Sequence, residues 1–303
     1  MVLGTKSSPN RRISFNNAKY DRIQKNEIKK SKIEGTQAVG SWTALGPNTN
    51  GGGYGGLGRI NVVREDPSNS TVIWAGSASG GLWKSTNNGS TWTTNTDNLG
   101  VLGVTDIAFH PTNSNIMFIA TGDGDAGDNY SIGVLKSTDA GATWNTTGLT
   151  WNVSAQRRIS RLLINPNNPN IMLVAGSAGI FRTTDGGTTW TNPNTSNYRD
   201  MEFKPDDPSV VYAGRYGSSQ IMKSTDSGAT WSAMSGLPTS GVYRVALAVT
   251  PANANYIYAL MSKSSDDGFY GLYRSTNAGS TWTSMSTTPN ILGWNTNGSD
   301  AGG

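Results

Sequence analysis

The chain of 303 residues contains no cysteine, a single histidine (His110) and only four glutamates. The absence of cysteine excludes disulfide bonds, thiolate catalysis and cysteine-based zinc or iron–sulfur sites. One histidine excludes a multi-histidine metal site. No apolar run approaches the ~20 residues that cross a bilayer, so no transmembrane segment is predicted. Charged residues make up 15% of the chain and 38 residues are glycine, which favours short strands and tight turns over helices.

The charge is unevenly distributed along the chain. Residues 1–36 carry nine Lys/Arg and three Asp/Glu, a net charge of +6, whereas the whole chain has +4 and the remainder therefore −2. Because the remainder has no positive excess, it is not expected to bind nucleic acid. We predict that residues 1–36 form a basic, mostly extended or disordered segment, and that residues 37–303 form the globular domain.

One segment of twelve residues occurs five times after residue 41. Its copies are GLWKSTNNGSTW (81–92), GVLKSTDAGATW (133–144), GIFRTTDGGTTW (179–190), QIMKSTDSGATW (220–231) and GLYRSTNAGSTW (271–282). An apolar stretch and a proline turn precede each copy, with the prolines at Pro67, Pro111, Pro166, Pro205 and Pro251. Each unit of about 40–50 residues thus reads as four short antiparallel strands, the pattern of a propeller blade. We predict an all-β fold, a β-propeller with about five visible blades.

The S-T-[DN]-x-G-x-T-W core of these copies resembles the Asp-box, or BNR repeat, a structural turn between the last two strands of a blade. A short carboxylate or amide in such a turn accepts hydrogen bonds from backbone N–H groups. The resemblance assigns a structural role to Asn87, Gly89, Trp92, Asp139, Gly141, Trp144, Asp185, Gly187, Trp190, Asp226, Gly228, Trp231, Asn277, Gly279 and Trp282. Such propellers usually have six to eight blades. We therefore expect an incomplete ring that continues beyond the chain, with residues 41–45 (SWTAL) as a candidate closing strand.

An acidic loop is the first candidate site on the opposite face, where the remaining loops should lie. The segment TGDGDAGDNYSIG (121–133) places Asp123, Asp125 and Asp128 close together. Three crowded carboxylates repel one another unless a cation is present, and oxygen-rich, glycine-flexible loops suit Ca²⁺. A calcium site is one interpretation, although no cofactor is required. A solvated acidic loop and a ligand-binding or catalytic loop are the alternatives.

Arginines near the start of the first strand of several blades are the second candidate site. Arg59 and Arg158 both lie eight residues before the proline of their blade, Arg199 and Arg244 are close to that register, and Asp200 is adjacent to Arg199. Several arginines facing one channel suit a bidentate contact with a carboxylate, and structural hydrogen bonds at strand ends are the alternative. Aromatic residues expected in the loops, for stacking on sugars or for packing, are Tyr54, Tyr130, Trp151, Tyr198 and Tyr216.

Two families of Asp-box enzymes provide comparisons. The segment containing Arg59, GRIN, is similar to the R-I-P motif of sialidases but lacks its proline, and Glu65 and Glu202 are the only glutamates after residue 36. The first blade also resembles Asp-box hydrolases of xyloglucan, where the catalytic Asp of that family falls at Ala78 in WAGSASGGLWKS. Alanine cannot act as a general acid or base.

The chain from residue 40 onward resembles large secreted BNR-repeat propellers of Bacteroidota, many of which are exported by type IX secretion. This resemblance implies a secreted or cell-surface location, with a glycan, a protein or type IX secretion components as partners. Because the repeat is complete but no catalytic set is recognisable, we predict a non-catalytic binding module. The alternatives are a glycoside hydrolase with catalytic acids in loops or missing blades, and a cargo or accessory subunit of an outer-membrane secretion machine tethered by residues 1–36.

Overall fold

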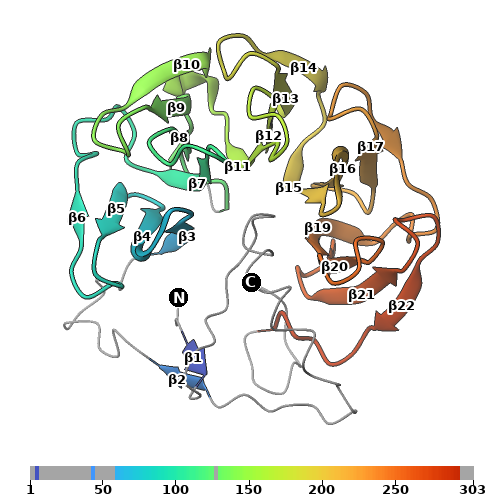
Figure 1. Ribbon diagram of the computed structural model, residues 1–303. Helices are drawn as coiled ribbons and strands as arrows, with labels where there is room; N and C mark the ends of the chain where they lie inside the picture. The colour runs from blue at the N-terminus through green and yellow to red at the C-terminus, as the bar shows by residue number, and fades with distance from the viewer. Residues whose placement is uncertain (1–3, 7–41, 45–58, 126–128, 294–303) are drawn as a thin grey trace.

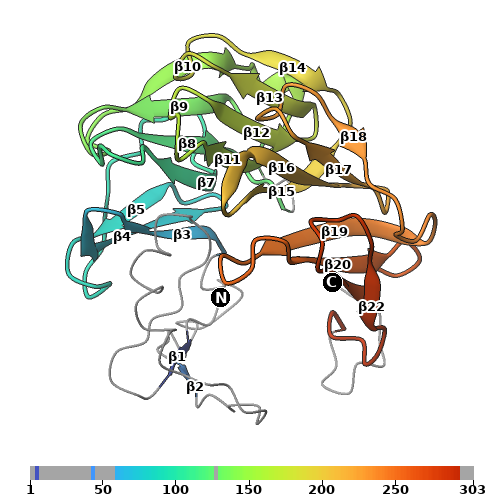
Figure 2. The same cartoon turned by 45° about the vertical axis from the view of Figure 1, so that its right-hand side comes forward.

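Five four-stranded antiparallel sheets are arranged as blades around a common axis (Figure 1). The computed structural model describes residues 4–6, 42–44, 59–125 and 129–293. In Figure 1 the blades follow one another in chain order along an arc, and Figure 2 shows that the arc is open between the first and fifth blades. The predicted all-β propeller with an incomplete ring is therefore confirmed.

Each blade contains four consecutive strands in chain order, with the first strand nearest the axis. The first blade comprises β3 (Ile60–Asp66), β4 (Asn69–Ser77), β5 (Leu82–Ser85) and β6 (Thr93–Thr94). The second comprises β7 (Val104–Phe109), β8 (Met117–Thr121), β9 (Gly133–Ser137) and β10 (Asn145–Thr150). The third comprises β11 (Ile159–Ile164), β12 (Met172–Gly176), β13 (Gly179–Thr183) and β14 (Thr191–Asn194). The fourth comprises β15 (Tyr198–Lys204), β16 (Asp207–Arg215), β17 (Ile221–Ser224) and β18 (Ser232–Ala233). The fifth comprises β19 (Val242–Val249), β20 (Ile257–Lys263), β21 (Phe269–Ser275) and β22 (Thr283–Ser286).

The hydrophobic core is divided into four clusters, each between two consecutive blades. In the first, Trp74 of blade 1 packs with Ile107 and Met117 of blade 2, and all three side chains are buried. Strands β8 and β12 are buried along their whole length. Because a blade buries its apolar residues against its neighbours, each blade depends on adjacent blades for stability.

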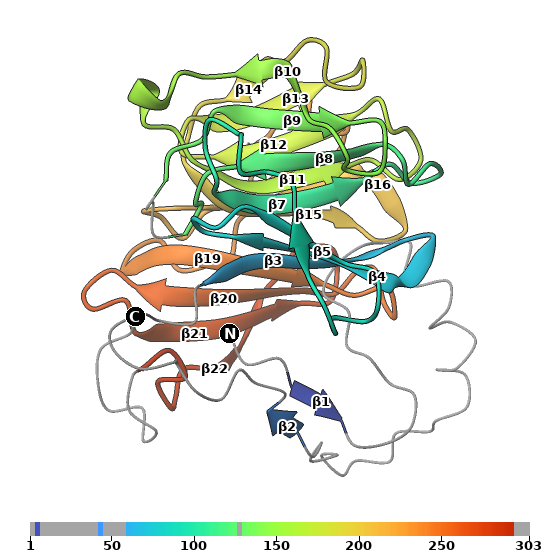
Figure 3. The same ribbon diagram turned by 90° about the vertical axis from the view of Figure 1, so that its left-hand side faces the viewer.

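The antiparallel strands give the arc two distinct faces (Figure 3). The first face, here called the loop face, contains the starts of the innermost strands and the loops between second and third strands, of which residues 78–81, 122–125, 129–132, 177–178, 216–220 and 264–268 are described. The opposite face, here called the turn face, contains the proline turns and the repeated S-T-[DN]-x-G-x-T-W segments, here called the repeat turns. All fifteen residues to which the sequence assigned a structural role belong to the repeat turns.

The repeat turns share one hydrogen-bond network, illustrated by the turn of blade 2. The Ser137 hydroxyl accepts a hydrogen bond from the Gly141 N–H (2.8 Å) and donates one to Asp139 Oδ1 (2.7 Å). Asp139 Oδ1 also accepts from the Thr143 N–H at 2.9 Å, a distance that recurs in all five turns. Hydrogen bonds from the Thr143 hydroxyl and N–H lower the pKa of Asp139 to about 2, so the carboxylate that closes the turn remains ionised near neutral pH.

The network also explains why asparagine replaces aspartate in two turns. In blade 2 the Thr143 hydroxyl donates to Asp139 Oδ2 (2.6 Å). In blade 1 Asn87 Nδ2 instead donates to the Thr91 hydroxyl (2.9 Å), and the turn of blade 5 has the same arrangement. The threonine hydroxyl can donate or accept, so it donates to an aspartate and accepts from an asparagine. In both cases the threonine N–H keeps its hydrogen bond to the side-chain oxygen of the Asp or Asn.

The N-terminal part of the described chain does not close the ring. Strand β2 (Trp42–Ala44) pairs with β1 (Gly4–Lys6) in a separate two-stranded sheet, so the expected closing strand at residues 41–45 was wrong for the part that is described. Residues 1–36, apart from 4–6, lie outside the described residues. The one helix of the described residues is a 3-10 turn, Val153–Ala155, and none of them forms a helix that could cross a membrane.

Candidate functional site

Each innermost strand contains a β-bulge close to the loop face. The register between the first and second strands shifts at the bulge in all five blades. The residues that follow the bulge are Val62, Asp106, Arg161, Asp200 and Arg244. Bulges redirect side chains and are frequent next to functional sites, and from blade 2 to blade 5 they place acidic and basic residues alternately around the axis.

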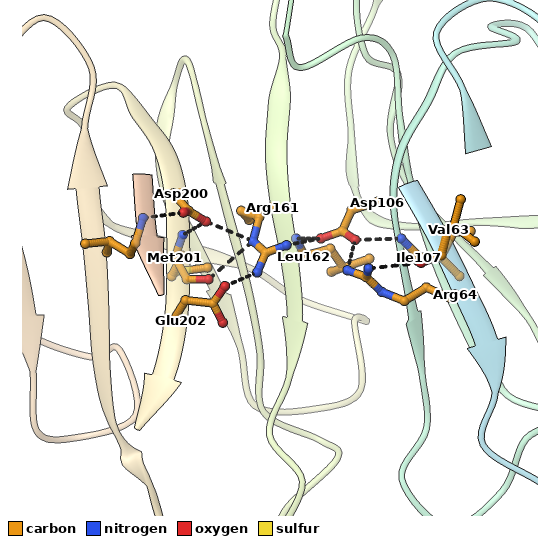
Figure 4. Close-up of polar contacts among 10 residues, drawn as sticks. Val63, Arg64, Asp106, Ile107, Arg161, Leu162, Asp200, Met201 and Glu202 are labelled. Carbon is orange, nitrogen blue, oxygen red and sulfur yellow. Dashed lines mark hydrogen bonds and ion pairs between the residues drawn. The ribbon is translucent and has the colours of Figure 1, made fainter. Parts of the chain in front are cut away.

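Four of the blades are linked by an ion network on these strands, here called the belt (Figure 4). Asp106 accepts hydrogen bonds from Arg64 Nη2 (2.7 Å) and from the Leu162 N–H of the next blade (2.9 Å). Arg161 lies between Asp106 (3.9 Å) and Asp200 (3.1 Å). The belt comprises Arg64, Asp106, Arg161, Asp200 and Glu202, on the innermost strands of blades 1 to 4.

The acidic end of the belt lies on β15. Arg161 Nη2 donates to Glu202 Oε1, and Asp200 Oδ2 accepts from the Leu247 N–H of blade 5 (2.7 Å). The side chains of Asp200 and Glu202 are 18% and 8% exposed. Both carboxylates are thus occupied by protein donors, so Asp200, a predicted ligand-binding residue, lies in the belt and contacts neighbouring blades.

Burial and charge act in opposite directions on the central pair of the belt. Burial raises the pKa of Glu202 to about 7, although the nearby Arg161 guanidinium acts to lower it. Burial disfavours the charge on Arg161, but Glu202, Asp200 and Asp106 outweigh it and raise the pKa of the guanidinium. Arg161 is therefore charged at all accessible pH values, whereas Glu202 changes protonation near neutrality.

The acidic loop of blade 2 extends across the loop face. Asp123 is fully buried, where its carboxylate accepts hydrogen bonds from Arg59 Nη2 and from Asn61 Nδ2 (3.3 Å). Two residues further on, Asp125 forms an ion pair with Arg244 of blade 5 (2.9 Å), and the two side chains are 52% and 47% exposed. One aspartate therefore anchors the loop and the other is accessible to solvent.

These contacts bear on the predicted calcium site. The argument for a cation rested on repulsion among Asp123, Asp125 and Asp128, but Arg59 and Arg244 neutralise the first two. Among the residues that the structure describes, no group of three His, Cys, Asp or Glu side chains could hold a metal ion. Asp128 lies outside the described residues, so calcium binding by the whole loop stays a prediction.

Arginine–aromatic contacts account for several other predicted residues on the loop face. The Arg158 guanidinium lies 5.4 Å from the Tyr130 ring, and the Arg199 guanidinium lies 4.4 Å from the Tyr216 ring. Trp151 packs against Phe181, with 5.4 Å between ring centroids, and is also covered by Arg157. These aromatic faces are partly covered by protein contacts.

Two predicted aromatic residues need a different account. Tyr198 was expected in a loop, but it is the first residue of β15, is fully buried and belongs to the core between blades 3 and 4. A ligand on the surface cannot stack on it, so its prediction as a ligand-binding residue was wrong. Tyr54 lies outside the described residues.

The Ala78 turn, where the family resemblance placed a catalytic aspartate, lies against the acidic loop. Ala78 is 5% exposed, and its N–H donates to the Arg59 carbonyl (3.1 Å). Its own carbonyl accepts a hydrogen bond from Asn129 Nδ2 of blade 2 (3.0 Å). The segment that contains Asp123 and Asp125 is thus held beside the Ala78 turn by its anchor residues at both ends.

Sequence reasoning missed three belt residues, Arg64, Asp106 and Arg161. A signal for two of them was present, because Asp106 and Arg161 each lie five residues before the proline of their blade, as do Val62 and Asp200. Alignment of the repeats on that proline would have revealed an aspartate, an arginine and a second aspartate at one position in blades 2 to 4. Arg64 lies three residues before Pro67, and the same position in blade 4 is Glu202, three residues before Pro205, so the alignment would have marked this position as well.

No family profile matches the chain. A xyloglucanase of Acetivibrio thermocellus is 30% identical over 277 residues, which are 85% of this chain and 29% of that protein. A xyloglucanase of a Paenibacillus species is 27% identical over 249 residues, 77% of this chain and 21% of that protein, and one of Hypocrea jecorina is 26% identical over 244 residues, 76% and 26%. The chain thus spans less than a third of the length of these relatives.

Solved structures agree on the fold. An ancestral GH74 enzyme superposes with a TM-score of 0.63 at 22% identity over 79% of this chain and 32% of that one. The GH74 xyloglucanase of Xanthomonas campestris superposes with a TM-score of 0.59 at 18% identity over 77% of this chain and 38% of that one.

The predicted non-catalytic binding module is contradicted by the comparisons, because the relatives found by sequence are xyloglucanases. The similarity supports the glycoside hydrolase alternative.

Proposed function

We propose that this chain forms the propeller part of a glycoside hydrolase that cleaves a xyloglucan-type glucan. The observation that carries the proposal is the 26–30% identity to three xyloglucanases over 76–85% of the chain. The fold of the GH74 structures supports it at the level of architecture. Since the chain spans only part of those proteins, the proposal concerns the intact gene product.

Ala78 cannot supply a carboxyl group to glycoside hydrolysis, so the carboxylate expected at this place must come from another residue. We assign this role to Asp125, because the loop that carries it packs on the Ala78 turn through Asn129. Asp123 is unsuitable, since it is fully buried and held by Arg59. Asp125 is half exposed, and its position is fixed by Arg244 and by its N–H, which donates to Asp123 Oδ1 (3.2 Å).

Asp125 forms an ion pair with Arg244 of blade 5. A carboxylate suits a general base or the stabilisation of positive charge on the sugar ring in the transition state. The reaction also needs a second carboxyl group as general acid. We place that group on another loop or on a part of the enzyme outside this chain.

The test is the release of reducing ends from xyloglucan by the intact gene product. We expect activity in the wild type and a loss of about 10²–10⁴-fold in kcat for Asp125→Asn. The matched control is Asp206→Asn, which alters an exposed aspartate paired with Lys204 on the turn face. The control should retain full activity, and both variants should retain the wild-type Tm.

Two results would contradict the proposal at different levels. No reducing ends released by the wild type, from xyloglucan or from an undecorated β-1,4-glucan, would refute the hydrolase. Full activity of Asp125→Asn alongside an active wild type would refute only the assignment of the carboxylate. In that case Asp266 and Asp267, both exposed on the blade 5 loop of the same face, are the next residues to replace.

We further propose that the protein acts outside the cytoplasm, because a polymeric glucan does not cross a membrane. Export by type IX secretion is the route that the sequence resemblance implies. It predicts that the protein is found in the medium or on the surface of wild-type cells and stays inside a strain that lacks this secretion system.

A further inference from the structure

The charged side chains of the loop face are segregated between its blades. In blades 3 and 4 the loop-face segments are residues 151–160, 177–178, 194–199 and 215–220, and none of them contains Asp or Glu. They contain four arginines, here called the basic sector: Arg157, Arg158, Arg199 and Arg215. The described loop-face segments of the other three blades have a net charge of −2. Their charged residues are Asp97, Asp123, Asp125, Asp266, Asp267, Arg59, Arg244 and Lys263.

The four arginines of the basic sector form no ion pair with any residue that the structure describes. The other two arginines of the loop face, Arg59 and Arg244, are each paired with an aspartate of the acidic loop. The carboxylate that follows Arg199 directly in the chain, Asp200, bonds instead to Arg161 and to the Leu247 N–H in the belt. No described carboxylate therefore neutralises the positive charge of the basic sector.

Contacts within the protein hold these guanidinium groups in place. Three of them stack on an aromatic ring, with 4.4–5.4 Å between the guanidinium carbon and the ring centroid. The pairs are Arg157 on Trp151, Arg158 on Tyr130 and Arg199 on Tyr216. Tyr216 is fixed in turn by blade 5, because its hydroxyl donates to the Tyr243 hydroxyl (2.7 Å). A stacked guanidinium keeps the N–H groups at its edge available, and its planar fork matches a carboxylate.

The basic sector adjoins Asp125, the proposed catalytic carboxylate. Tyr216, on which Arg199 stacks, forms a β-bridge with Arg244, and the side chain of Arg244 pairs with Asp125. On the other side, the ring of Tyr130 that carries Arg158 belongs to the same loop as Asp125. A glycan bound at Asp125 would therefore extend over guanidinium groups that have no acceptor in the protein.

We propose that the basic sector binds an acidic substituent, the carboxylate of a uronate unit, on an otherwise neutral β-1,4-glucan. The class of polymer rests on the proposed function, and the charge of the substituent rests on the four arginines. A carboxylate accepts two parallel hydrogen bonds from a guanidinium, which makes this contact strong and directional. A uniformly charged polyanion is disfavoured, because the aspartates of the blade 2 and blade 5 loops on the same face repel it. An isolated acidic unit on a neutral chain avoids this repulsion.

The test is affinity electrophoresis of the intact gene product, run in the cold to keep the polymer intact. The gels contain either a carboxymethyl β-1,4-glucan of low substitution or the neutral hydroxyethyl β-1,4-glucan. We expect the Kd for the carboxymethyl glucan to be at least about tenfold lower, as one charge-assisted contact provides. The preference should disappear when the ionic strength is raised from about 0.01 M to about 1 M, because the Debye length falls from ~30 Å to ~3 Å.

Two matched arginine variants locate the contact. Arg199→Gln should weaken the binding of the carboxymethyl glucan about tenfold and leave the binding of the neutral glucan unchanged. The control is Arg274→Gln. Like Arg199, Arg274 is partly buried, stacks on a tyrosine (Tyr256, 5.6 Å) and has no ion pair among the described residues, but it lies beside the repeat turn on the turn face. This variant removes the same charge and should keep the wild-type preference.

Several results would overturn the proposal. They are equal affinity of the wild type for the two glucans, an equal loss in the two variants, and tighter binding of a sulfated β-1,4-glucan or of duplex DNA than of the carboxymethyl glucan. Because no turnover is measured, the outcome is separate from that of the proposed function. Release of reducing ends from xyloglucan without any preference for the carboxymethyl glucan would refute only the basic sector as a binding site. The preference in a protein that releases no reducing ends would refute only the hydrolase.

Discussion

Glu202 should make the stability of the protein fall as the pH rises from 5 to 7.5. In the unfolded chain this carboxyl loses its proton near its ordinary pKa of 4.5, whereas in the folded protein burial raises the pKa to about 7. Between these values the folded state binds the proton that the unfolded state has released. The free energy of unfolding therefore decreases with increasing pH in this window.

The size of the effect follows from the two pKa values. A tenfold change in proton concentration alters the free energy by about 1.4 kcal/mol for each proton bound. Over the interval from 4.5 to about 7 the loss is about 3 kcal/mol, a large share of the stability of a typical domain. Glu202→Gln should abolish this dependence, because the amide keeps the shape of the side chain and does not titrate.

The assay is urea unfolding followed by tryptophan fluorescence at pH 5, 6, 7 and 8 for the wild type and Glu202→Gln. The control is His110→Gln, which removes the only histidine, the other side chain that ordinarily titrates in this range. This control should retain the wild-type slope. A wild-type stability that does not change between pH 5 and 7.5, or an unchanged slope in Glu202→Gln, would refute the reasoning.

Two further predictions concern the belt and the repeat turns. Asp106→Ala should lower the free energy of unfolding, measured in urea, by about 3–5 kcal/mol, because Arg64 and the Leu162 N–H lose their acceptor. The control Asp206→Ala alters an exposed ion pair with Lys204 and should lower it by less than about 1 kcal/mol. Gly141→Ala should destabilise the protein more than Gly217→Ala does, by at least about 1 kcal/mol. Both glycines have a positive φ, but only at Gly141 would the new methyl group overlap a side chain, that of Trp74. Equal losses in the two glycine variants would contradict the packing argument.

The blades could be predicted from the sequence because the interactions that define them are local. In the turn of blade 2, Ser137, Asp139, Gly141 and Thr143 bond to one another within seven residues. A short motif therefore contains all the partners that it needs, and five copies at regular spacing determine the fold class. The position of the turns then determines which face carries the other loops.

The belt could not be predicted in the same way, because its contacts join residues of different blades. Asp106 and Arg161 are 55 positions apart in the sequence, and a bulge sets which side chains of their strands face the neighbouring blade. Tyr198 was misplaced for a related reason. The polar residues before it indicated a loop, but β15 begins at that residue and directs it into the core.

The alternation of charge after the bulges restricts how such a propeller can change its number of blades. Asp106, Arg161, Asp200 and Arg244 have opposite signs from one blade to the next, so the electrostatic repeat is two blades long although the backbone repeat is one. Duplication or deletion of a single blade within this region would put two aspartates or two arginines on neighbouring blades at the residue after the bulge, where like charges repel each other. Exchange of blades in pairs would keep opposite charges adjacent. Recombination or design based on this ring should therefore treat two blades as its unit.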